Sequence, residues 1–349
     1  MTRLRRGEQR WNVALKVVRV GRPITEEQAK PERAKLASVG AELVLHPYQG
    51  EADLIAAVAD ADAVINAGGR FPATVINAMT RCRVLVQGSV GYDAIDVEAA
   101  TARKLPVANL FDYCIEEVAE HALTLSLACA RRLTFMQDAV RSGLWRRDWA
   151  AMRERIGLVE RLSTQTLGIV GFGNIGKLVA RKGGGMGWRI LAADPFVDPA
   201  IGPQHGVEVV PLERLLAESD IVTLHVFLNQ QTRQMMGAPQ FALMKPTAYL
   251  INTCRGPIVN EAALIDALRR GQIAGAGLDV FEFEPIEDNN PLLGMENVIL
   301  TPHTAVYSRL ALELNRMQPF DEVVRVLSGR YPRGLVNRAL RGQLPLADG

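Results

Sequence analysis

A glycine-rich turn between an apolar strand and a helix limits the folds open to this chain more than any other feature. The segment 171–176 reads Gly-Phe-Gly-Asn-Ile-Gly and directly follows the apolar run 167–170. Gly171 permits a tight turn, Gly173 lets backbone N–H groups approach a pyrophosphate, and Gly176 lets the helix pack closely on the strand. This context predicts a parallel α/β sheet that binds a dinucleotide at the helix N-terminus.

An acidic residue follows the glycine turn at the spacing expected of a dinucleotide site. The next apolar run ends in Ala193 and Asp194, about 20 residues further on. A carboxylate there accepts hydrogen bonds from the adenosine 2′-hydroxyl and repels a 2′-phosphate, which favours NAD over NADP. The alternative is a plain turn residue before Pro195. The three glycines 183–185 predict that the helix ends near Lys182, because each glycine in a helix costs about 1 kcal/mol relative to alanine.

Strand-like and helix-like segments alternate through both halves of the 349 residues, a length typical of about two domains. In the first half we predict strands at 13–20, 42–45, 63–66, 83–87 and 106–108, and helices at 26–39, 52–59, 72–79 and 95–103. In the second half we predict strands at 167–170, 189–193, 221–225, 248–252, 275–279 and 298–300. Such βα series form parallel sheets covered by helices on both faces.

The remaining helices suggest how the two halves are connected. A helix at 115–132 leads into the second half, and a helix at 308–328 leads back to the first. We therefore predict two doubly wound domains, with chain crossovers at hinges near 109–113 and 302–305. A flavodoxin-like substrate domain would comprise 1–112 and 305–349. A Rossmann NAD-binding domain would comprise 113–304.

The composition excludes several classes of function. Forty Lys and Arg residues against 38 Asp and Glu leave a formal charge of +2, too balanced for a protein that binds mainly nucleic acid or an anionic membrane. No apolar run is long enough to span a bilayer, and the basic start, 1–10, lacks the features of a secretion signal, so we interpret it as a loose tail. The four scattered cysteines predict neither a disulfide framework nor a metal site, which fits a reducing cytoplasm.

Three chemically distinctive residues follow late strands of the second half: Arg255, Glu284 and His303. Ligands bind at the carboxyl ends of strands in open α/β sheets, so we expect the three to share a site. An arginine fork suits a carboxylate, and an imidazole titrates near neutral pH and suits proton transfer. Glu284 would pair with His303 and orient it. Each residue taken alone also has a purely structural interpretation. Arg255 could be an ion-pair partner, Glu284 a turn acid and His303 a loop histidine.

Several longer motifs resemble the D-isomer-specific 2-hydroxyacid dehydrogenases over nearly all of residues 13–339. Within this family the chain is most similar to the C-terminal-binding-protein-like branch. The resemblance rests on the segments 112–121, 161–176, 194–196, 252–256, 278–285 and 300–308. It implies an NAD-dependent enzyme that interconverts 2-oxo and D-2-hydroxy acids, with Arg255, Glu284 and His303 as catalytic residues.

The resemblance also implies contacts with cofactor and substrate. Cofactor contacts would come from Gly171, Gly173, Asn174, Ile175, Gly176, Asp194, His225, Thr253, Cys254 and Asp279, with Asp279 at the nicotinamide carboxamide and His225 on the adenosine side. Substrate contacts would come from Ser89, Val90, Gly91, Arg255 and Val306. Backbone N–H groups of 89–91 would hold the carboxylate, unless this is an ordinary βα turn.

The chain departs from the branch pattern at three positions. Phe227, Cys254 and Val306 stand where the branch usually has proline, alanine and tryptophan. Val306 would leave a wider substrate pocket. Cys254 is either a packing residue or a redox-sensitive thiol. Glu284 disfavours formate oxidation, whose enzymes carry glutamine at the matching position.

Some assignments stay open at this point. Phosphite oxidation fits the same three catalytic residues, and animal relatives of the branch act as NAD-sensing corepressor scaffolds. A family tendency to form dimers makes the helix 118–130 a candidate two-fold interface, and an internal packing helix is the alternative. His46 and His205 have no partner motif, and we expect His121 to be a packing residue.

Overall fold

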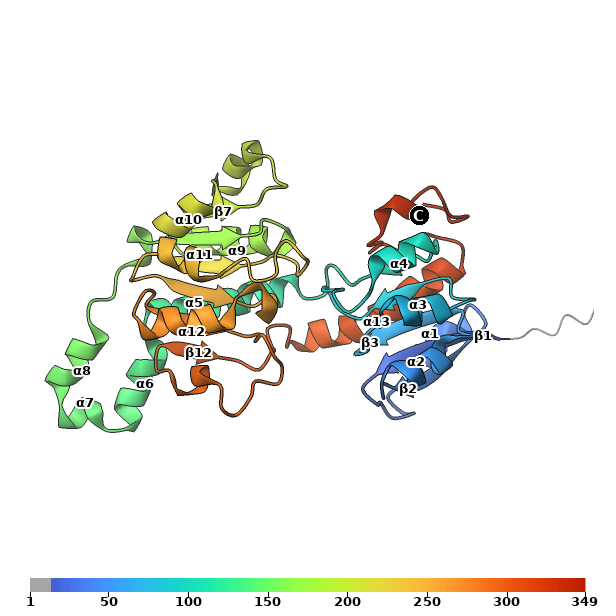
Figure 1. The fold of residues 1–349 in the computed structure, drawn as a ribbon, viewed down its shortest axis with the longest axis horizontal. Helices are drawn as coiled ribbons and strands as arrows, with labels where there is room; N and C mark the ends of the chain where they lie inside the picture. The colour runs from blue at the N-terminus through green and yellow to red at the C-terminus, as the bar shows by residue number, and fades with distance from the viewer. Residues whose placement is uncertain (1–13, 349) are drawn as a thin grey trace, which may run out of the picture. The chain divides into compact units, whose positions relative to one another are not determined.

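The computed structural model describes residues 14–348, so the basic segment 1–10 and the predicted strand start at Val13 lie outside the described residues. The chain forms two compact units (Figure 1). One contains the chain up to Tyr113 and from Leu312 onward, and the other contains Cys114–Ala311.

The first unit is built on a five-stranded parallel sheet with the flavodoxin-like order β2-β1-β3-β4-β5. Its strands are β1 (Leu15–Gly21), β2 (Ala41–Pro47), β3 (Ala63–Ala67), β4 (Leu85–Gln87) and β5 (Val107–Ala108). Its helices are α1 (Lys30–Ala37), α2 (Glu51–Val58), α3 (Ala73–Ala78), α4 (Val97–Ala102), most of α13 (Arg309–Leu327) and the short η5 (Arg338–Leu340).

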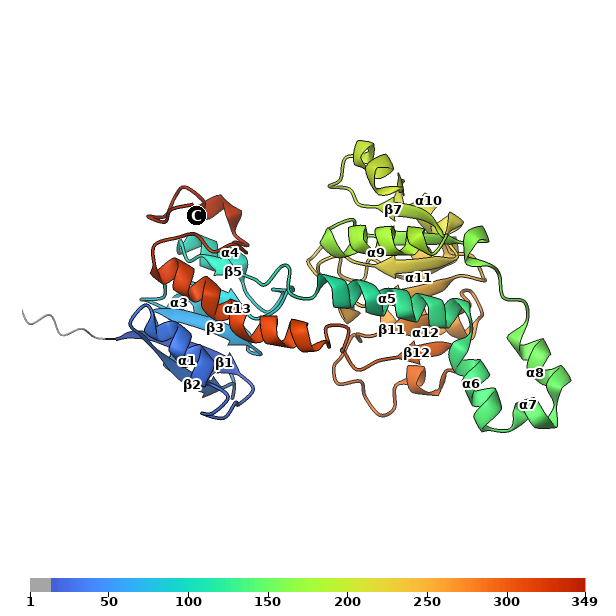
Figure 2. The same ribbon diagram turned by 180° about the vertical axis from the view of Figure 1, so that it is seen from behind.

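Alternating apolar residues on these strands build a core on each face of the sheet. Val17 packs with Phe320 on the face covered by α1 and α13 (Figure 2). Val18 packs with Leu54 and Ile76 on the face covered by α2, α3 and α4. A parallel sheet that is buried on both faces needs apolar residues at nearly every position, which explains why apolar runs located the strands.

The C-terminal segment completes the first unit. Leu335 forms an antiparallel bridge with Ala108 of β5. Next to it, the Asn337 side chain accepts from the Val107 N–H at 2.9 Å and donates to the Leu105 carbonyl at 2.9 Å. The last helix and tail therefore belong structurally with residues 14–113.

The second unit contains a seven-stranded parallel sheet with the order β12-β11-β10-β9-β6-β7-β8. Its strands are β6 (Thr166–Val170), β7 (Arg189–Ala193), β8 (Glu208–Val209), β9 (Ile221–Leu224), β10 (Tyr249–Asn252), β11 (Gly275–Leu278) and β12 (Val298–Leu300). Its α-helices are α5 (Ile115–Ala130), α6 (Leu133–Arg141), α7 (Leu144–Arg147), α8 (Trp149–Ile156), α9 (Asn174–Gly185), α10 (Leu212–Glu218), α11 (Ala238–Leu243) and α12 (Glu261–Arg269). Four short 3₁₀ turns are η1 (Leu162–Thr164), η2 (Pro199–His205), η3 (Gly256–Ile258) and η4 (Pro291–Gly294). This is the predicted Rossmann arrangement, whose strand order reverses between β6 and β9.

Helix α5 packs inside its own unit. Its apolar side, including Leu123, Leu125 and Cys129, is buried in the core that also contains residues of α9 and the central strands (Figure 2). The structure thus favours the internal alternative over the predicted two-fold interface for this helix.

Helix α9 runs through the three glycines to Gly185, so the predicted end near Lys182 is wrong. Close packing favours glycine at position 183, whereas the Cβ positions of Gly184 and Gly185 are open. A Cβ at position 183 would lie 3.0 Å from the Leu167 side chain, so only a glycine fits there without movement.

Helices α6, α7 and α8, which the sequence analysis left unassigned, form an arm that extends from the second unit (Figures 1 and 2). Several large apolar side chains of this arm and its flanks are exposed: Leu133, Val140, Trp145, Trp149 and Leu158. Within residues 14–348 no helix has both the length and the apolar character needed to cross a bilayer.

Candidate active site

The glycine turn lies where β6 ends, beside the end of β9. Gly171 has φ +93°, and a Cβ there would lie 2.5 Å from the His225 carbonyl oxygen. A Cβ at Gly176 would lie 2.2 Å from the Gly171 carbonyl oxygen. Gly173 caps α9 and has open space where its Cβ would be. The first and third glycines are thus required by the fold, whereas the second leaves room for a ligand at the helix N-terminus.

Asp194 connects the end of β7 with this turn. Its Oδ2 accepts from the Phe172 N–H at 2.8 Å, and its Oδ1 accepts from the Phe196 N–H at 2.9 Å. A carboxylate has about four acceptor positions, so both oxygens can still accept from a ribose hydroxyl. The predicted ribose acid and the predicted pyrophosphate turn therefore form one hydrogen-bonded unit.

Two buried polar atoms at this edge of the sheet have no partner among the described residues. They are His225 Nδ1, just after β9, and Thr253 Oγ1, just after β10. His225 Nε2 is paired with Thr223 Oγ1 at 3.0 Å, and burial lowers the pKa of His225 to about 3, so the ring is neutral. Buried polar atoms without partners are rare in native proteins. Both positions were predicted to contact the cofactor, and polar groups of a bound dinucleotide would fit them.

The three predicted catalytic residues lie after β10, β11 and β12 at the carboxyl edge of the same sheet. His303 Nδ1 and Glu284 Oε2 are 2.6 Å apart. Glu284 Oε1 also accepts from the Phe281 N–H at 3.0 Å. Burial alone would raise the pKa of Glu284, but the bonds from His303 and Phe281 and the charges of His303 and Arg255 outweigh it and lower that pKa. Glu284 is therefore ionised at neutral pH and faces Nδ1 of the imidazole, which leaves Nε2 for a ligand.

Arg255 directly precedes the η3 turn, and its Nη1 donates to the Cys254 carbonyl at 2.9 Å. Gly256 is required beside it, because a Cβ there would lie 1.7 Å from the Phe281 carbonyl oxygen. The close backbone approach brings the segment after β10 against the segment that leads to Glu284. This contact explains how Arg255 comes near enough to influence the Glu284 carboxylate.

His303 has φ +52°, in the left-handed region that side chains other than glycine rarely adopt. Asp279 holds the segment in this conformation. Its carboxylate accepts from the Thr301 hydroxyl at 2.6 Å and from the backbone N–H groups of Thr304 and Ala305, each at 2.9 Å. Its carbonyl accepts from the His303 N–H at 2.8 Å. We call these four contacts the Asp279 clamp.

The clamp bears on two expectations from the sequence. Asp279 is completely buried, and its carboxylate accepts from protein donors, so it holds the His303 segment as well; its expected contact with the nicotinamide carboxamide stays a prediction. His121 is not a simple packing residue, because its Nε2 lies 2.9 Å from Thr301 Oγ1 and 3.5 Å from Asp279 Oδ1. Asp279 also ties residues 304 and 305 to the second unit, which the structure describes as Cys114–Ala311.

Burial raises the pKa of Asp279, but hydrogen bonds from His121, Thr301 and the backbone of Thr304 and Ala305 outweigh this and lower it. The clamp therefore contains an ionised carboxylate at neutral pH. Sequence reasoning missed His121 and Thr301 as functional candidates. Thr301 directly precedes the Pro302-His303 pair and could have been noticed, whereas His121 lies 180 residues away from it and gives no local signal.

The structure shows the surroundings of the three residues that depart from the family pattern. Burial raises the pKa of Cys254 to about 11, and its Sγ lies 3.0 Å from Asn252 Oδ1, which fits a packing residue better than a reactive thiol. Phe227 is 54% exposed. Val306 is half-buried and follows the clamp.

The predicted substrate turn, 89–91, belongs to the first unit and follows β4. The Ser89 hydroxyl donates to the Gly91 carbonyl at 2.8 Å, and Asn109 Nδ2 donates to the Val90 carbonyl at 2.7 Å. Among the described residues no acceptor binds the Val90 and Gly91 N–H groups. The turn thus has its carbonyl groups fixed and retains backbone donors suited to an anion.

Comparisons with known proteins show the family of the chain. Residues 123–305 match the sequence profile of the D-isomer specific 2-hydroxyacid dehydrogenase NAD binding domain. A glyoxylate reductase from Korarchaeum cryptofilum is 42% identical over 286 residues, which cover 82% of this chain and 85% of that protein. The chain belongs to this family. The dehydrogenase is therefore an NAD-dependent oxidoreductase that acts on CH–OH groups.

Solved structures extend the agreement to the fold. A D-lactate dehydrogenase from Aquifex aeolicus, complexed with NAD and lactic acid, aligns with the dehydrogenase at a TM-score of 0.77 and 28% identity, covering 90% of this chain and 96% of that one. An acyclic imino acid reductase in complex with NADPH and D-Arg aligns at a TM-score of 0.81 and 26% identity, covering 92% and 100%. The fold thus accommodates both nicotinamide cofactors, and the preference of this dehydrogenase depends on its own residues.

Proposed function

We propose that this dehydrogenase reduces a small 2-oxo acid to the D-2-hydroxy acid, with Arg255, Glu284 and His303 as its catalytic residues. The observation that carries the proposal is the contact of 2.6 Å between Glu284 and His303 Nδ1, made by a histidine in a left-handed backbone conformation. Uncommon conformations persist where the surrounding structure enforces them, and they concentrate at functional sites.

Each residue has a distinct part in the reaction. The planar fork of Arg255 binds the substrate carboxylate and orients the adjacent carbonyl. The ionised Glu284 stabilises the protonated imidazole and directs Nδ1 toward itself, so that Nε2 donates its proton to the developing alkoxide. When bound, NADH supplies the hydride that reduces the carbonyl carbon. The reverse reaction uses the neutral His303 as the base.

The cofactor would be held by the glycine turn with Asn174 and Ile175, and by Asp194, His225, Thr253 and the backbone at Cys254. Asp194 supports NAD over NADP, because its carboxylate lies beside the turn and would repel a 2′-phosphate. The five residues 194–198 include a second acid, Asp198, and no Lys or Arg that could bind such a phosphate.

The substrate class is supported by the reductase relatives and by the turn 89–91. We propose that the Val90 and Gly91 N–H groups bind the carboxylate together with Arg255. Val306, in place of the tryptophan expected from the branch resemblance, leaves room for a larger side group than glyoxylate carries. If Val306→Trp leaves the preferred size of the 2-oxo acid unchanged, this part of the proposal is wrong.

The deciding experiment follows NADH oxidation with graded 2-oxo acids, from glyoxylate through pyruvate to branched and aromatic ones, and uses NADPH and His303→Ala as controls. We expect turnover with NADH that His303→Ala reduces by at least about 100-fold. The sequence motifs of the C-terminal-binding-protein-like branch motivate the competing function, an NAD-sensing scaffold. NADH binding without any turnover would favour that scaffold, or a non-carbon substrate such as phosphite.

We also propose a cytoplasmic homodimer. The arm α6–α8 supports dimerisation, because Trp145 and Trp149 are 55% and 54% exposed and exposed aromatic clusters mark interaction surfaces. The proposed interface therefore lies on α6–α8, which follow α5, the candidate named from the sequence. A reducing compartment fits the four free cysteines.

A further inference from the structure

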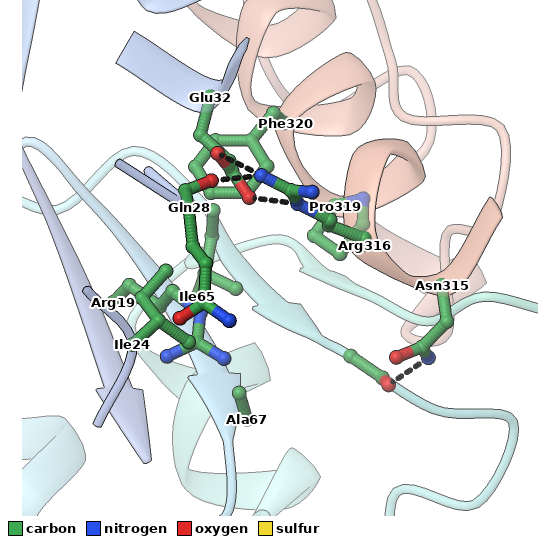
Figure 3. Close-up of a pocket in the computed structure, with 11 residues that line it drawn as sticks. Arg19, Ile24, Gln28, Glu32, Ile65, Ala67, Asn315, Arg316, Pro319 and Phe320 are labelled. Atoms are coloured by element: carbon green, nitrogen blue, oxygen red, sulfur yellow. Dashed lines mark hydrogen bonds and ion pairs between the residues drawn. The ribbon is translucent and has the colours of Figure 1, made fainter. Parts of the chain in front are cut away.

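The first unit contains a pocket that the proposed reaction does not use. Its volume is about 200 Å³, and it lies at the carboxyl ends of β1 and β3, beneath α1 and α13 (Figure 3). In the strand order β2-β1-β3-β4-β5 the direction of winding reverses between β1 and β3. Doubly wound sheets bind ligands at this switch point. The pocket therefore occupies the position in this unit where the fold favours a ligand.

The pocket wall combines apolar surface with a few polar groups. Ile24, Ile65, Pro319 and Phe320 provide apolar surface. The polar lining residues are Arg19, Gln28, Glu32, Asn315 and Arg316. Mostly apolar walls with a few placed polar groups are typical of sites for small organic molecules. A cavity of about 200 Å³ has room for a small organic acid.

The charged groups of the pocket are not balanced. Glu32 is buried, and its carboxylate binds Arg316 through two contacts, Nε at 2.6 Å and Nη2 at 3.1 Å. Arg316 Nη2 also donates to the Gln28 carbonyl. Glu32 and Arg316 thus neutralise one another and join α1 to α13. The remaining charge of the pocket is the guanidinium of Arg19.

Arg19 lacks a close counter-ion. It extends from β1 on the face covered by α1 and α13, beside Ile65 of β3. Among residues 14–348 it forms no ion pair, and its single hydrogen bond runs from Nη1 to the Arg22 carbonyl at 2.9 Å. Burial lowers the pKa of Arg19 more than the charge of Glu32 raises it. A partly buried guanidinium with unused donors is best satisfied by an anion.

We propose that this pocket binds the carboxylate of a small organic acid, with Arg19 as its counter-ion and Ile65, Pro319 and Phe320 around its carbon chain. The net charge of Arg19, Arg316 and Glu32 is one positive charge, which suits a monocarboxylate better than a phosphate dianion. The proposal does not rest on the proposed function, because none of the residues that line the pocket is assigned to the proposed reaction.

Butyrate is a suitable probe, with butyramide and inorganic phosphate as controls. Titration calorimetry on the full chain carrying Arg255→Gln removes the other arginine proposed to bind a carboxylate. In this background we expect saturable butyrate binding, with little binding of butyramide or phosphate. Arg19→Gln should weaken it at least about tenfold, the effect of losing one charged hydrogen bond. Arg22→Gln is the matched control, because it removes an exposed charge nearby and keeps the backbone carbonyl that Arg19 contacts. The butyrate affinity of this variant should change less than twofold.

A second variant guards against a folding defect in Arg19→Gln. Ala67→Leu adds volume to the pocket wall without changing charge, and it should weaken butyrate as well. Equal butyrate affinity with and without Arg19→Gln, or no saturable binding at all, would overturn the proposal.

Discussion

The Asp279 clamp makes a sharp prediction about Thr301. The Thr301 hydroxyl donates to the ionised Asp279 carboxylate at 2.6 Å and lies 2.9 Å from His121 Nε2, so it can accept from that nitrogen. Thr301→Val keeps nearly the same shape and removes only the hydroxyl. The perturbation therefore tests whether this hydrogen bond helps to hold the left-handed His303.

The size of the effect follows from the contacts that are lost. A hydrogen bond to a charged group contributes about 1.5–3 kcal/mol. His121 loses its partner too, but its side chain is 23% exposed and water can replace the hydroxyl. A net loss of about 2 kcal/mol would lower the Tm of a domain of this size by about 4–8 °C. The strained backbone at His303 itself costs about 1–3 kcal/mol, so a loss of this size shifts the population of the competent conformation.

Two measurements test this expectation. Thermal unfolding should show the lower Tm, and steady-state kinetics should show kcat reduced by up to about 30-fold, with KM changed less because Arg255 is outside the clamp. Thr301→Ser should restore both values. Thr124→Val is the matched control, since the Thr124 hydroxyl lies on the exposed side of α5 and donates to the Glu120 carbonyl one turn earlier. A lower Tm with unchanged kcat would refute a positioning role, and no change in either would refute the hydrogen bond.

Three further predictions concern other parts of the molecule. The folded-state pKa of Glu284 is lowered, so its ionised form stabilises the fold above the unfolded value, about 4.3. The Tm difference between the wild type and Glu284→Gln should therefore be constant at neutral pH and shrink as the pH falls below about 4; a difference that grows on acidification would contradict this sign. Trp145→Ala with Trp149→Ala should convert the dimer into a monomer in size-exclusion chromatography with light scattering, whereas Phe196→Ala, which removes another exposed aromatic, should not; a wild-type monomer would disprove the arm interface. Because burial raises the pKa of Cys254 to about 11, iodoacetamide at pH 7.5 should label it only after unfolding, as mass spectrometry would show, and rapid labelling of the native protein would revive the reactive-thiol alternative.

The parts of the fold that the sequence predicted well are those with a local physical signature. Strands buried on both faces consist of apolar runs, and β6, β7 and β12 lie within a residue of their predicted positions. The arm 133–156 was missed because its three helices are only 9, 4 and 8 residues long, too short for a repeated apolar pattern to stand out. Helix α9 was predicted too short because helix propensity alone disregards packing, and at Gly183 a side chain would crowd Leu167.

The sequence likewise predicted only part of the candidate active site. Arg255, Glu284 and His303 stand out because their chemistry is unusual beside apolar strand ends, and that information is local. The residues that support them are not marked in this way, since His121 and Thr301 are 180 positions apart and their contact depends on where α5 crosses the sheet. The pocket at Arg19 also depends on distant partners, because Glu32 and Arg316 are separated by 284 positions. The structure shows that Glu32 and Arg316 neutralise each other. Without knowledge of that ion pair, the sequence gives no indication that the charge of Arg19 is unbalanced. Sequence patterns therefore indicate which groups can act, whereas the three-dimensional structure is needed to show which of them still lack a partner.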